Sequence, residues 1–158
     1  KFQDTNIWNV VKAFNDYDIC PTGNFIFGLP EDTLETMEET LKMAMELPIA
    51  YANLYSAMSY PGSELHRIQQ RQDSSKLPEN NGTGWIGYSQ HAYETYSAGN
   101  KHLSGAEVLK FRDYAFNKFF TNQEYIDRMS KKFGQPFQSE VNRMLEVKLP
   151  RQLLGEKQ

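Results

Sequence analysis

The sequence lacks several features that would narrow its function at once. It holds one cysteine, Cys20, among 158 residues, so neither an intrachain disulfide nor a multi-cysteine metal site can form within it. The net charge of −3 argues against a nucleic-acid surface, which needs clustered Lys and Arg. No apolar run approaches the roughly 20 residues needed to span a bilayer. No signal-peptide pattern is present either, so we expect a cytoplasmic protein without a membrane partner.

Motifs for common catalytic sites are also missing. The sequence contains no H-E-x-x-H, C-x-x-C, P-loop, G-x-S-x-G or G-x-G-x-x-G. His66, His91 and His102 lie far apart, which argues against a metal site. Ser89 precedes His91 by two residues, but neighbours in one loop rarely form a nucleophile and its base. By itself the sequence supplies no complete catalytic machinery and no metal ligands.

Aromatic residues, by contrast, are plentiful, with 10 Phe, 9 Tyr and 2 Trp. Most of these rings suit a core, and some suit a ligand cleft. The chain is organised around residues 22–65, where the pattern predicts strand, turn, helix, strand and turn, which is a βαβ unit of an α/β fold. Ligands of such units gather in the loops beyond the carboxyl ends of the strands. We therefore look for function at residues 28–31 and 58–63.

The first predicted strand has two unlike faces, because side chains alternate along a strand. The bulky face suits packing against helices, and the smaller face suits a cleft where a ligand comes close. Cys20, just before this strand, is expected to be a small buried hydrophobe rather than a reactive thiol. The smaller face carries Asn24, Ile26 and Gly28, and the bulky face carries Phe25, Phe27 and Leu29.

Helical periodicity and capping boxes predict the remaining elements. The basic end, residues 148–158, is expected to be loosely held. The predicted helices are 6–17, capped by Thr5 or Asn6; one opened by Asp32 with Glu35 and ended by Pro48; a polar helix over 64–72; 105–120, capped by Ser104 with Glu107; one opened by Thr121 with Glu124 and ended by Gly134; and 138–147.

Residues 85–99 (WIGYSQHAYETYSAG) mix aromatic and polar side chains without helical spacing. Such a segment suits a loop over a cleft mouth, in which case Tyr88, Gln90, His91 and Tyr93 are candidate substrate contacts. The alternative is a surface loop that is fixed by its aromatic rings. We divide the chain into βα units over 1–72, a polar-aromatic loop region over 73–103 and a helical region over 104–158.

The stretch Asn-Phe-Ile-Phe-Gly-Leu-Pro-Glu (24–31) resembles the G-x-I-x-G-x-x-E motif of the radical S-adenosylmethionine (SAM) superfamily. Ile26, Gly28 and Glu31 match that motif, whereas Asn24 stands where its first Gly is expected. FIFGLPEDT and YPGSEL are similar to a subgroup that often carries a cobalamin-binding domain ahead of its barrel. GYSQHAYE and LSGAEVLKFRDYAF are similar to the later part of such proteins. The resemblance covers about residues 6–147.

This resemblance implies a partial (β/α) barrel with about two to three parallel strands, followed by a helical C-terminal region. It implies SAM and a [4Fe–4S] cluster as cofactors of the parent protein, and it leaves open whether cobalamin is used. Carried over residue by residue, contacts to the SAM adenine fall to Ile26, Gly28, Ala57 and Met58. Glu31 is expected to brace the turn rather than touch the cofactor.

The family's C-x-x-x-C-x-x-C loop is absent, and Cys20 alone cannot replace it because a cluster needs several thiolates. We therefore expect a C-terminal fragment that supplies the SAM adenine wall and part of a substrate cleft. The cysteine loop is expected upstream of Lys1, so that the missing N-terminal half is the fragment's partner. The fragment alone is expected to bind no cofactor and to be inactive. Exposed sheet edges should also pair two copies. The alternative is a non-catalytic α/β binding or interaction domain.

Overall fold

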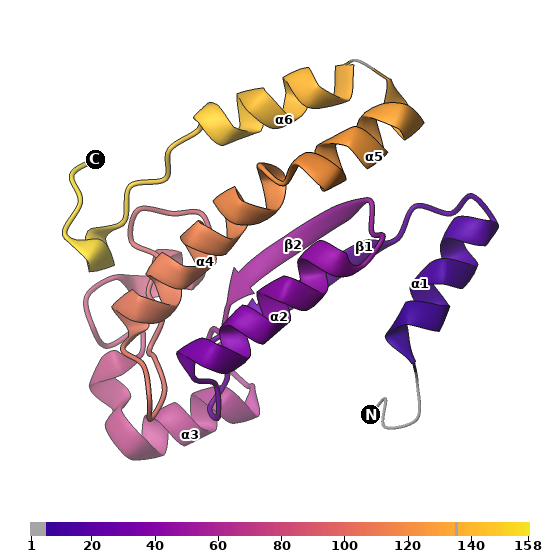
Figure 1. Cartoon of the computed structure of the whole chain (residues 1–158). Coiled ribbons are helices and arrows are strands. Elements are labelled where there is room, and N and C mark those ends of the chain that lie inside the picture. The colour runs from indigo at the N-terminus through magenta and orange to yellow at the C-terminus, as the bar shows by residue number, and fades with distance from the viewer. Residues whose placement is uncertain (1–5, 135) are drawn as a thin grey trace.

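The computed structural model describes residues 6–134 and 136–158, and a βαβ unit lies at its centre (Figure 1). Strands β1 (Thr22–Phe27) and β2 (Tyr51–Ser56) are parallel and in register, from Thr22 opposite Tyr51 to Phe27 opposite Ser56. Helix α2 (Leu34–Glu46) connects them, as a parallel pair requires, since its strands can be joined only by a crossover. The predicted βαβ unit is confirmed.

The predicted partial (β/α) barrel is wrong for the part of the chain that the structure describes. Residues 6–134 and 136–158 contain one sheet, with β1 and β2 as its only strands, and the rest of the regular structure is helical. A closed or curved barrel wall needs further tilted strands in a continuous ladder. Here side chains and helices, rather than additional strands, surround the pair. The class is α/β, but the architecture is a two-stranded sheet with helices.

One face of the sheet forms the core. Phe25, Phe27 and Leu54 are buried beneath α2 and α4 (Gly105–Phe120), which both contact the strands. The Phe27 and Phe111 rings meet edge to face, with centroids 5.1 Å apart. The bulky face is thus confirmed for Phe25 and Phe27, whereas Leu29 is 45% exposed because it follows the strand.

The opposite face of the sheet is open. Asn24 is exposed, and Ile26 is 45% exposed although it lies in the middle of the ladder. Their register partners are Asn53 and Tyr55, and Asn53 Nδ2 donates to Asn24 Oδ1 at 2.9 Å. This partly polar face is the smaller face that alternation predicts.

Most of the helices begin next to a residue whose side chain accepts a hydrogen bond from the backbone of the first turn. Asn6 caps α1 (Ile7–Asp16), and Thr5, the other predicted cap, lies outside the described residues. The Ser104–Glu107 box at α4 and the Gly134 end of α5 (Gln123–Phe133) are confirmed. Two caps differ by one residue: α2 uses Thr33 with Thr36 rather than Asp32 with Glu35, and α5 uses Asn122 rather than Thr121. The remaining elements are α3 (Glu64–Asp73), η1 (Ser74–Lys76), η2 (Gly84–Tyr88), α6 (Pro136–Glu146) and η3 (Gln152–Leu154).

Two expectations about burial are wrong. Cys20 is exposed rather than buried beside the first strand. The C-terminal segment is held firmly, because Arg151 is fully buried and Gln152 N donates to Tyr93 O at 2.9 Å. Among residues 6–134 and 136–158, no helix has the length and apolar character needed to cross a membrane.

Candidate functional site

A pocket of about 420 Å³ lies at the carboxyl ends of the two strands. β1 contributes Ile26, the chain after β2 contributes Ala57, Met58 and Tyr60, and the polar-aromatic loop contributes Gln90. None of the nine lining side chains carries a formal charge at neutral pH. The volume lies within the range of small-molecule sites. The position is the one where ligands of parallel α/β units bind.

The turn after β1 shapes one side of this pocket. Gly28 has φ +83°, and Asp32 Oδ2 accepts from Gly28 N at 2.9 Å and from Leu29 N at 2.8 Å. Asn100 Nδ2 donates to Leu29 O at 2.7 Å and to Asp32 O at 3.0 Å. Asp32 is therefore a turn-forming residue. The sequence pattern predicts Asp32 as the helix cap, whereas Thr33 caps α2 in the structure.

Gly28 has a second reason to lack a side chain. A Cβ at this position would lie 2.4 Å from Val108 Cγ1, inside the contact between the turn and α4. Gly28 is not among the lining residues of the pocket. The glycine is needed for backbone conformation and for core packing, which differs from the adenine contact that the resemblance implies.

Two other residues of the motif also lie outside the lining of the pocket. Glu31 forms an ion pair with Lys101, and this hydrogen bond lowers the pKa of the Glu31 carboxyl. Its side chain is exposed and it braces the turn against the chain before α4. Asn24 is bound to Asn53 on the open face. The structure therefore brings Ile26, Ala57 and Met58 together at this pocket and leaves Asn24, Gly28 and Glu31 outside its lining.

Gln90 lines the pocket and also caps the free edge of β2. Its Nε2 donates to Ser56 O at 2.9 Å, and its Oε1 accepts from Ser56 N at 3.1 Å. Ser56 Oγ also donates to the same Oε1 at 3.1 Å. One side chain thus satisfies the backbone groups that a third strand would otherwise bind.

Tyr88 lies behind the pocket wall. Its ring contacts Tyr60, with centroids 5.7 Å apart, and Tyr60 lines the pocket. Tyr88 Oη donates to Glu79, which also bonds His66 Nε2 at 2.7 Å. Burial and the Glu79 carboxylate raise the pKa of Tyr88 well above its ordinary value. Tyr88 thus contacts Tyr60 and does not itself line the pocket.

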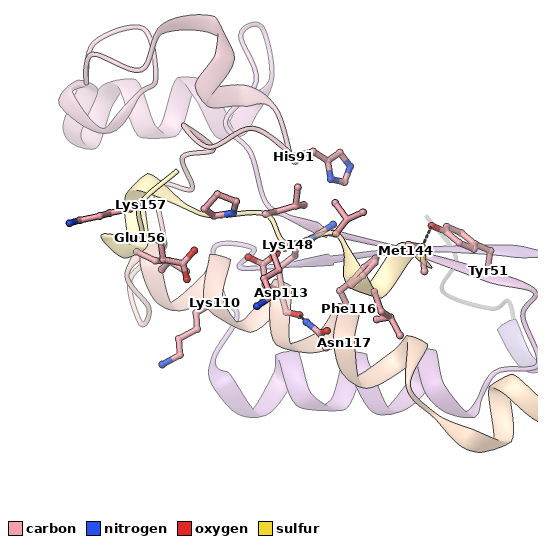
Figure 2. Close-up of a pocket in the computed structure, with 16 residues that line it drawn as sticks. Tyr51, His91, Lys110, Asp113, Phe116, Asn117, Met144, Lys148, Glu156 and Lys157 are labelled. Carbon is pink, nitrogen blue, oxygen red and sulfur yellow. Dashed lines mark hydrogen bonds and ion pairs between the residues drawn. The ribbon is translucent and has the colours of Figure 1, made fainter. Parts of the chain in front are cut away.

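The other two candidate substrate residues lie elsewhere. His91 lines a second pocket on the side of α4, which Figure 2 shows. Tyr93 Oη donates to Glu156 O at 2.9 Å and so fastens the C-terminal segment. Of the four residues assigned to substrate, Gln90 is the one that lines the pocket at the strand ends.

Sequence reasoning missed a charged network beneath the loop. Arg112 Nε donates to Leu54 O at 2.8 Å on the free edge of β2, and Arg112 is 4% exposed. Arg151 Nη1 donates to Gln90 O and to Ala92 O, both at 3.1 Å. Asp113 accepts from both guanidinium groups. The sequence does contain a signal that Arg112 is buried: it lies four residues after Val108, and residues at this spacing share one face of a helix.

A [4Fe–4S] cluster does not fit the residues of this chain. Cys20 is its one cysteine, whereas such a cluster is held by several thiolates. Within the described ranges, no group of three or more His, Cys, Asp or Glu side chains is placed to hold a metal ion.

Comparison with known proteins gives one partial match. Over 57 residues, which is 36% of this chain, the sequence is 39% identical to an uncharacterized methyltransferase of Pyrococcus horikoshii. The aligned part covers 12% of that protein, so the match spans only a small share of its length. No protein-family model matches the chain. No solved structure matches it. The chain is therefore similar to a methyltransferase over about a third of its residues.

Proposed function

We propose that the pocket at the strand ends binds the adenosine part of SAM, and that the chain is the C-terminal part of a radical SAM enzyme. One observation carries this proposal. Ile26 in β1 and Ala57 and Met58 directly after β2 line one pocket at the expected edge of the sheet. The motif in residues 24–31 and the partial match to a methyltransferase support the same class of cofactor.

The chemistry of the lining favours one end of SAM over the other. An uncharged wall of aliphatic and aromatic side chains suits a nucleoside, and the Tyr60 ring offers a surface on which a base can stack. The charged methionine end needs ion pairs that this pocket does not offer. When bound, SAM supplies a methyl group or, after one-electron reduction, a 5′-deoxyadenosyl radical. The role proposed for this chain is to hold the adenosine.

Other residues of a longer protein would have to supply the cluster. The cysteine content of this chain does not fit it, so we expect no radical chemistry from these 158 residues alone. The apolar side of α1 leaves Ile7 44% exposed and Phe14 42% exposed, as suits a helix that packs against a further part of the protein. Cobalamin use and a cytoplasmic location rest on the resemblance and the sequence alone.

The test is a titration of the 158-residue chain with SAM, with 5′-methylthioadenosine and with methionine, followed by calorimetry. The sequence alone leads us to expect no bound cofactor, but the pocket is formed within this chain, so SAM and 5′-methylthioadenosine should bind to it with affinities that agree within about tenfold. Methionine should not bind, because the pocket recognises the nucleoside. Ile26→Ala should weaken both adenosine ligands. Ile86→Ala is the matched control, since Ile86 is 50% exposed and lies outside the pocket.

Failure of both adenosine compounds to bind the folded chain at millimolar concentration would contradict the proposal. The non-catalytic binding or interaction domain would then be the better description. Equal weakening by Ile26→Ala and Ile86→Ala would place the nucleoside somewhere other than this pocket.

A further inference from the structure

A second and larger pocket, of about 790 Å³, lies between α4 and the chain that follows α6 (Figure 2). α4 supplies Lys110 and Phe116, the C-terminal segment supplies Lys148, and the polar-aromatic loop supplies His91. It shares no lining residue with the pocket at the strand ends. The function proposed above makes no use of it.

A buried guanidinium forms part of the lining. Arg112 is 4% exposed, and it binds Leu54 O through Nε and Asp113 Oδ1 through Nη1, both at 2.8 Å. Its Nη2 donates to no side chain or backbone group of residues 6–134 and 136–158. This nitrogen is not among the buried polar atoms that lack a partner, so it keeps accessible surface and is a donor available to a ligand in the pocket that Arg112 lines.

The charges around this nitrogen do not balance. Arg151 is fully buried and also binds Asp113, through Nε and Nη2 at 3.0 Å each. Two buried cations therefore share one carboxylate. Glu156 lies nearby, but it is exposed and accepts from the backbone N of Arg151. A buried positive excess of this kind is stabilised by an anion.

The exposed lysines around the pocket add to this positive charge. Lys110, Lys148 and Lys157 line the pocket, against Asp113 and Glu156 as the acidic lining residues, although the whole chain has a charge of −3. Burial lowers the pKa of His91, and the Arg112 and Arg151 charges lower it further. His91 is therefore a neutral imidazole at neutral pH, able to donate one hydrogen bond to an anionic oxygen.

The remaining walls are apolar. They combine a ring from α4 with apolar side chains from the end of α6 and the segment after it, so that a ligand would have an apolar body as well as a charged group. The Arg112 guanidinium itself lies 5.3 Å from the centroid of the Phe116 ring, which joins the polar and apolar parts. The apolar wall consists of Phe116, Met144, Leu145, Val147, Leu149 and Pro150.

We propose that this pocket binds an amphipathic organic anion. The carboxylate or phosphate of the ligand bonds Arg112 Nη2 and the His91 imidazole, and its apolar body lies along Phe116 and Met144. The site does not depend on SAM, so the outcome of the SAM titration leaves this proposal unaffected.

The test uses three molecules of ten carbon atoms each: decanoate, decyl phosphate and decanol. The chain contains three histidines, so the ring signals of His91 in an NMR spectrum are identified by their loss in His91→Gln. Each anion should shift these signals, and the shift should reach saturation below the concentration at which that anion forms micelles. Decanol should bind at least about tenfold more weakly, because hydrogen bonds to a charged group contribute more than neutral ones. Decanoate and decyl phosphate together identify the preferred head group.

Variants check which residues recognise the anion. Lys110→Glu with Lys148→Glu should weaken decanoate by about fivefold or more, since two exposed charges are reversed. Lys131→Glu, at an exposed site on α5, is the matched control and should change nothing. Arg112→Lys keeps the charge but removes Nη2. If Arg112→Lys folds, it should weaken anion binding further. If it does not fold, the double variant of Lys110 and Lys148 still tests the proposal.

Three results would overturn the proposal. One is decanol binding as tightly as the anions, which would describe a merely apolar groove. Another is anion binding that leaves the His91 signals unmoved. The third is an equal loss of affinity in Lys131→Glu and in the double variant of Lys110 and Lys148, which would indicate a general charge effect.

Discussion

The side-chain amide of Gln90 binds the backbone of Ser56 as a neighbouring strand would, through Nε2 to the carbonyl at 2.9 Å and Oε1 to the amide at 3.1 Å. Ala57 N donates to Phe27 O at 2.7 Å, so residue 57 faces β1 and residue 56 faces the opposite, free edge of β2. The loop that contains Gln90 is therefore fixed to the strand that lines the pocket.

Replacing Gln90 by Leu should destabilise the protein by about 1–3 kcal/mol, because two backbone groups of Ser56 lose their partners in a half-buried place. The affinity for 5′-methylthioadenosine should fall as well, since Gln90 lines the pocket. Urea unfolding and calorimetry measure the two effects. Gln138→Leu, at an exposed position on α6, is the control. Equal stability of the two variants would contradict the role of Gln90.

Arg151 is expected to be the most sensitive residue of the C-terminal segment. Removing one partner of a buried ion pair costs about 3–5 kcal/mol, so Arg151→Ala and a chain ending at Pro150 should unfold at much lower urea concentration. Arg151→Lys should recover only part of the loss, because Lys cannot bind Asp113 with two nitrogens. Arg143→Ala, which breaks an exposed pair with Glu140, should cost under about 1 kcal/mol. Similar losses in both Ala variants would refute this ranking.

Replacing Asp32 by Ala should destabilise the protein much more than replacing Glu35 by Ala. Asp32→Ala leaves Gly28 N and Leu29 N without their acceptor and should cost about 1–2 kcal/mol. Glu35→Ala should cost less than about 0.5 kcal/mol, because Thr33 and Thr36 form the box of α2. Thermal unfolding of the two variants is the measurement. A larger loss for Glu35→Ala would support the box read from the sequence.

Local patterns predicted local structure well and distant contacts poorly. Alternation placed Ile26 on the open face, and the βαβ topology brought it to Ala57 and Met58 at one end of the sheet. The helix caps missed by one residue where several capping residues adjoin, as in Asp32-Thr33, because each of them is able to accept from the first turn.

The remaining errors have a common cause. Arg151 finds its partners 38 to 61 residues away, at Asp113 and Gln90, and no spacing rule reports such contacts. The barrel was carried over from a resemblance, although these residues provide only two strands in the described chain. The motif identified Gly28 but not its contact with Val108, which depends on how α4 docks.

The lowered pKa of His91 makes stability depend on pH. The unfolded chain binds a proton at this imidazole more readily than the folded one, so this group lowers stability as pH falls below about 6.5, its ordinary pKa. His91→Gln lacks this effect. It should therefore lose less free energy of unfolding than the wild type between about pH 7.5 and about pH 5.5, as urea titrations at both pH values would show. An equal loss in the two proteins would exclude a lowered pKa at His91.

Strand β1 is the part of the sheet from which we expect self-association. Gln90 and Arg112 occupy the free edge of β2, whereas the outer edge of β1 pairs with no strand in the described chain. Asn24 N points to that edge, because Phe27 O accepts from Ala57 N across the ladder, so that Phe27 and the alternate residues Phe25 and Gly23 face β2. Asn24→Pro removes this donor without breaking the ladder, and Asn24→Ala removes only the side-chain bond to Asn53. In sedimentation experiments over a range of concentrations, Asn24→Ala should dimerise like the wild type and Asn24→Pro should stay monomeric. If the wild type is monomeric at every concentration, the outer edge of β1 does not mediate self-association.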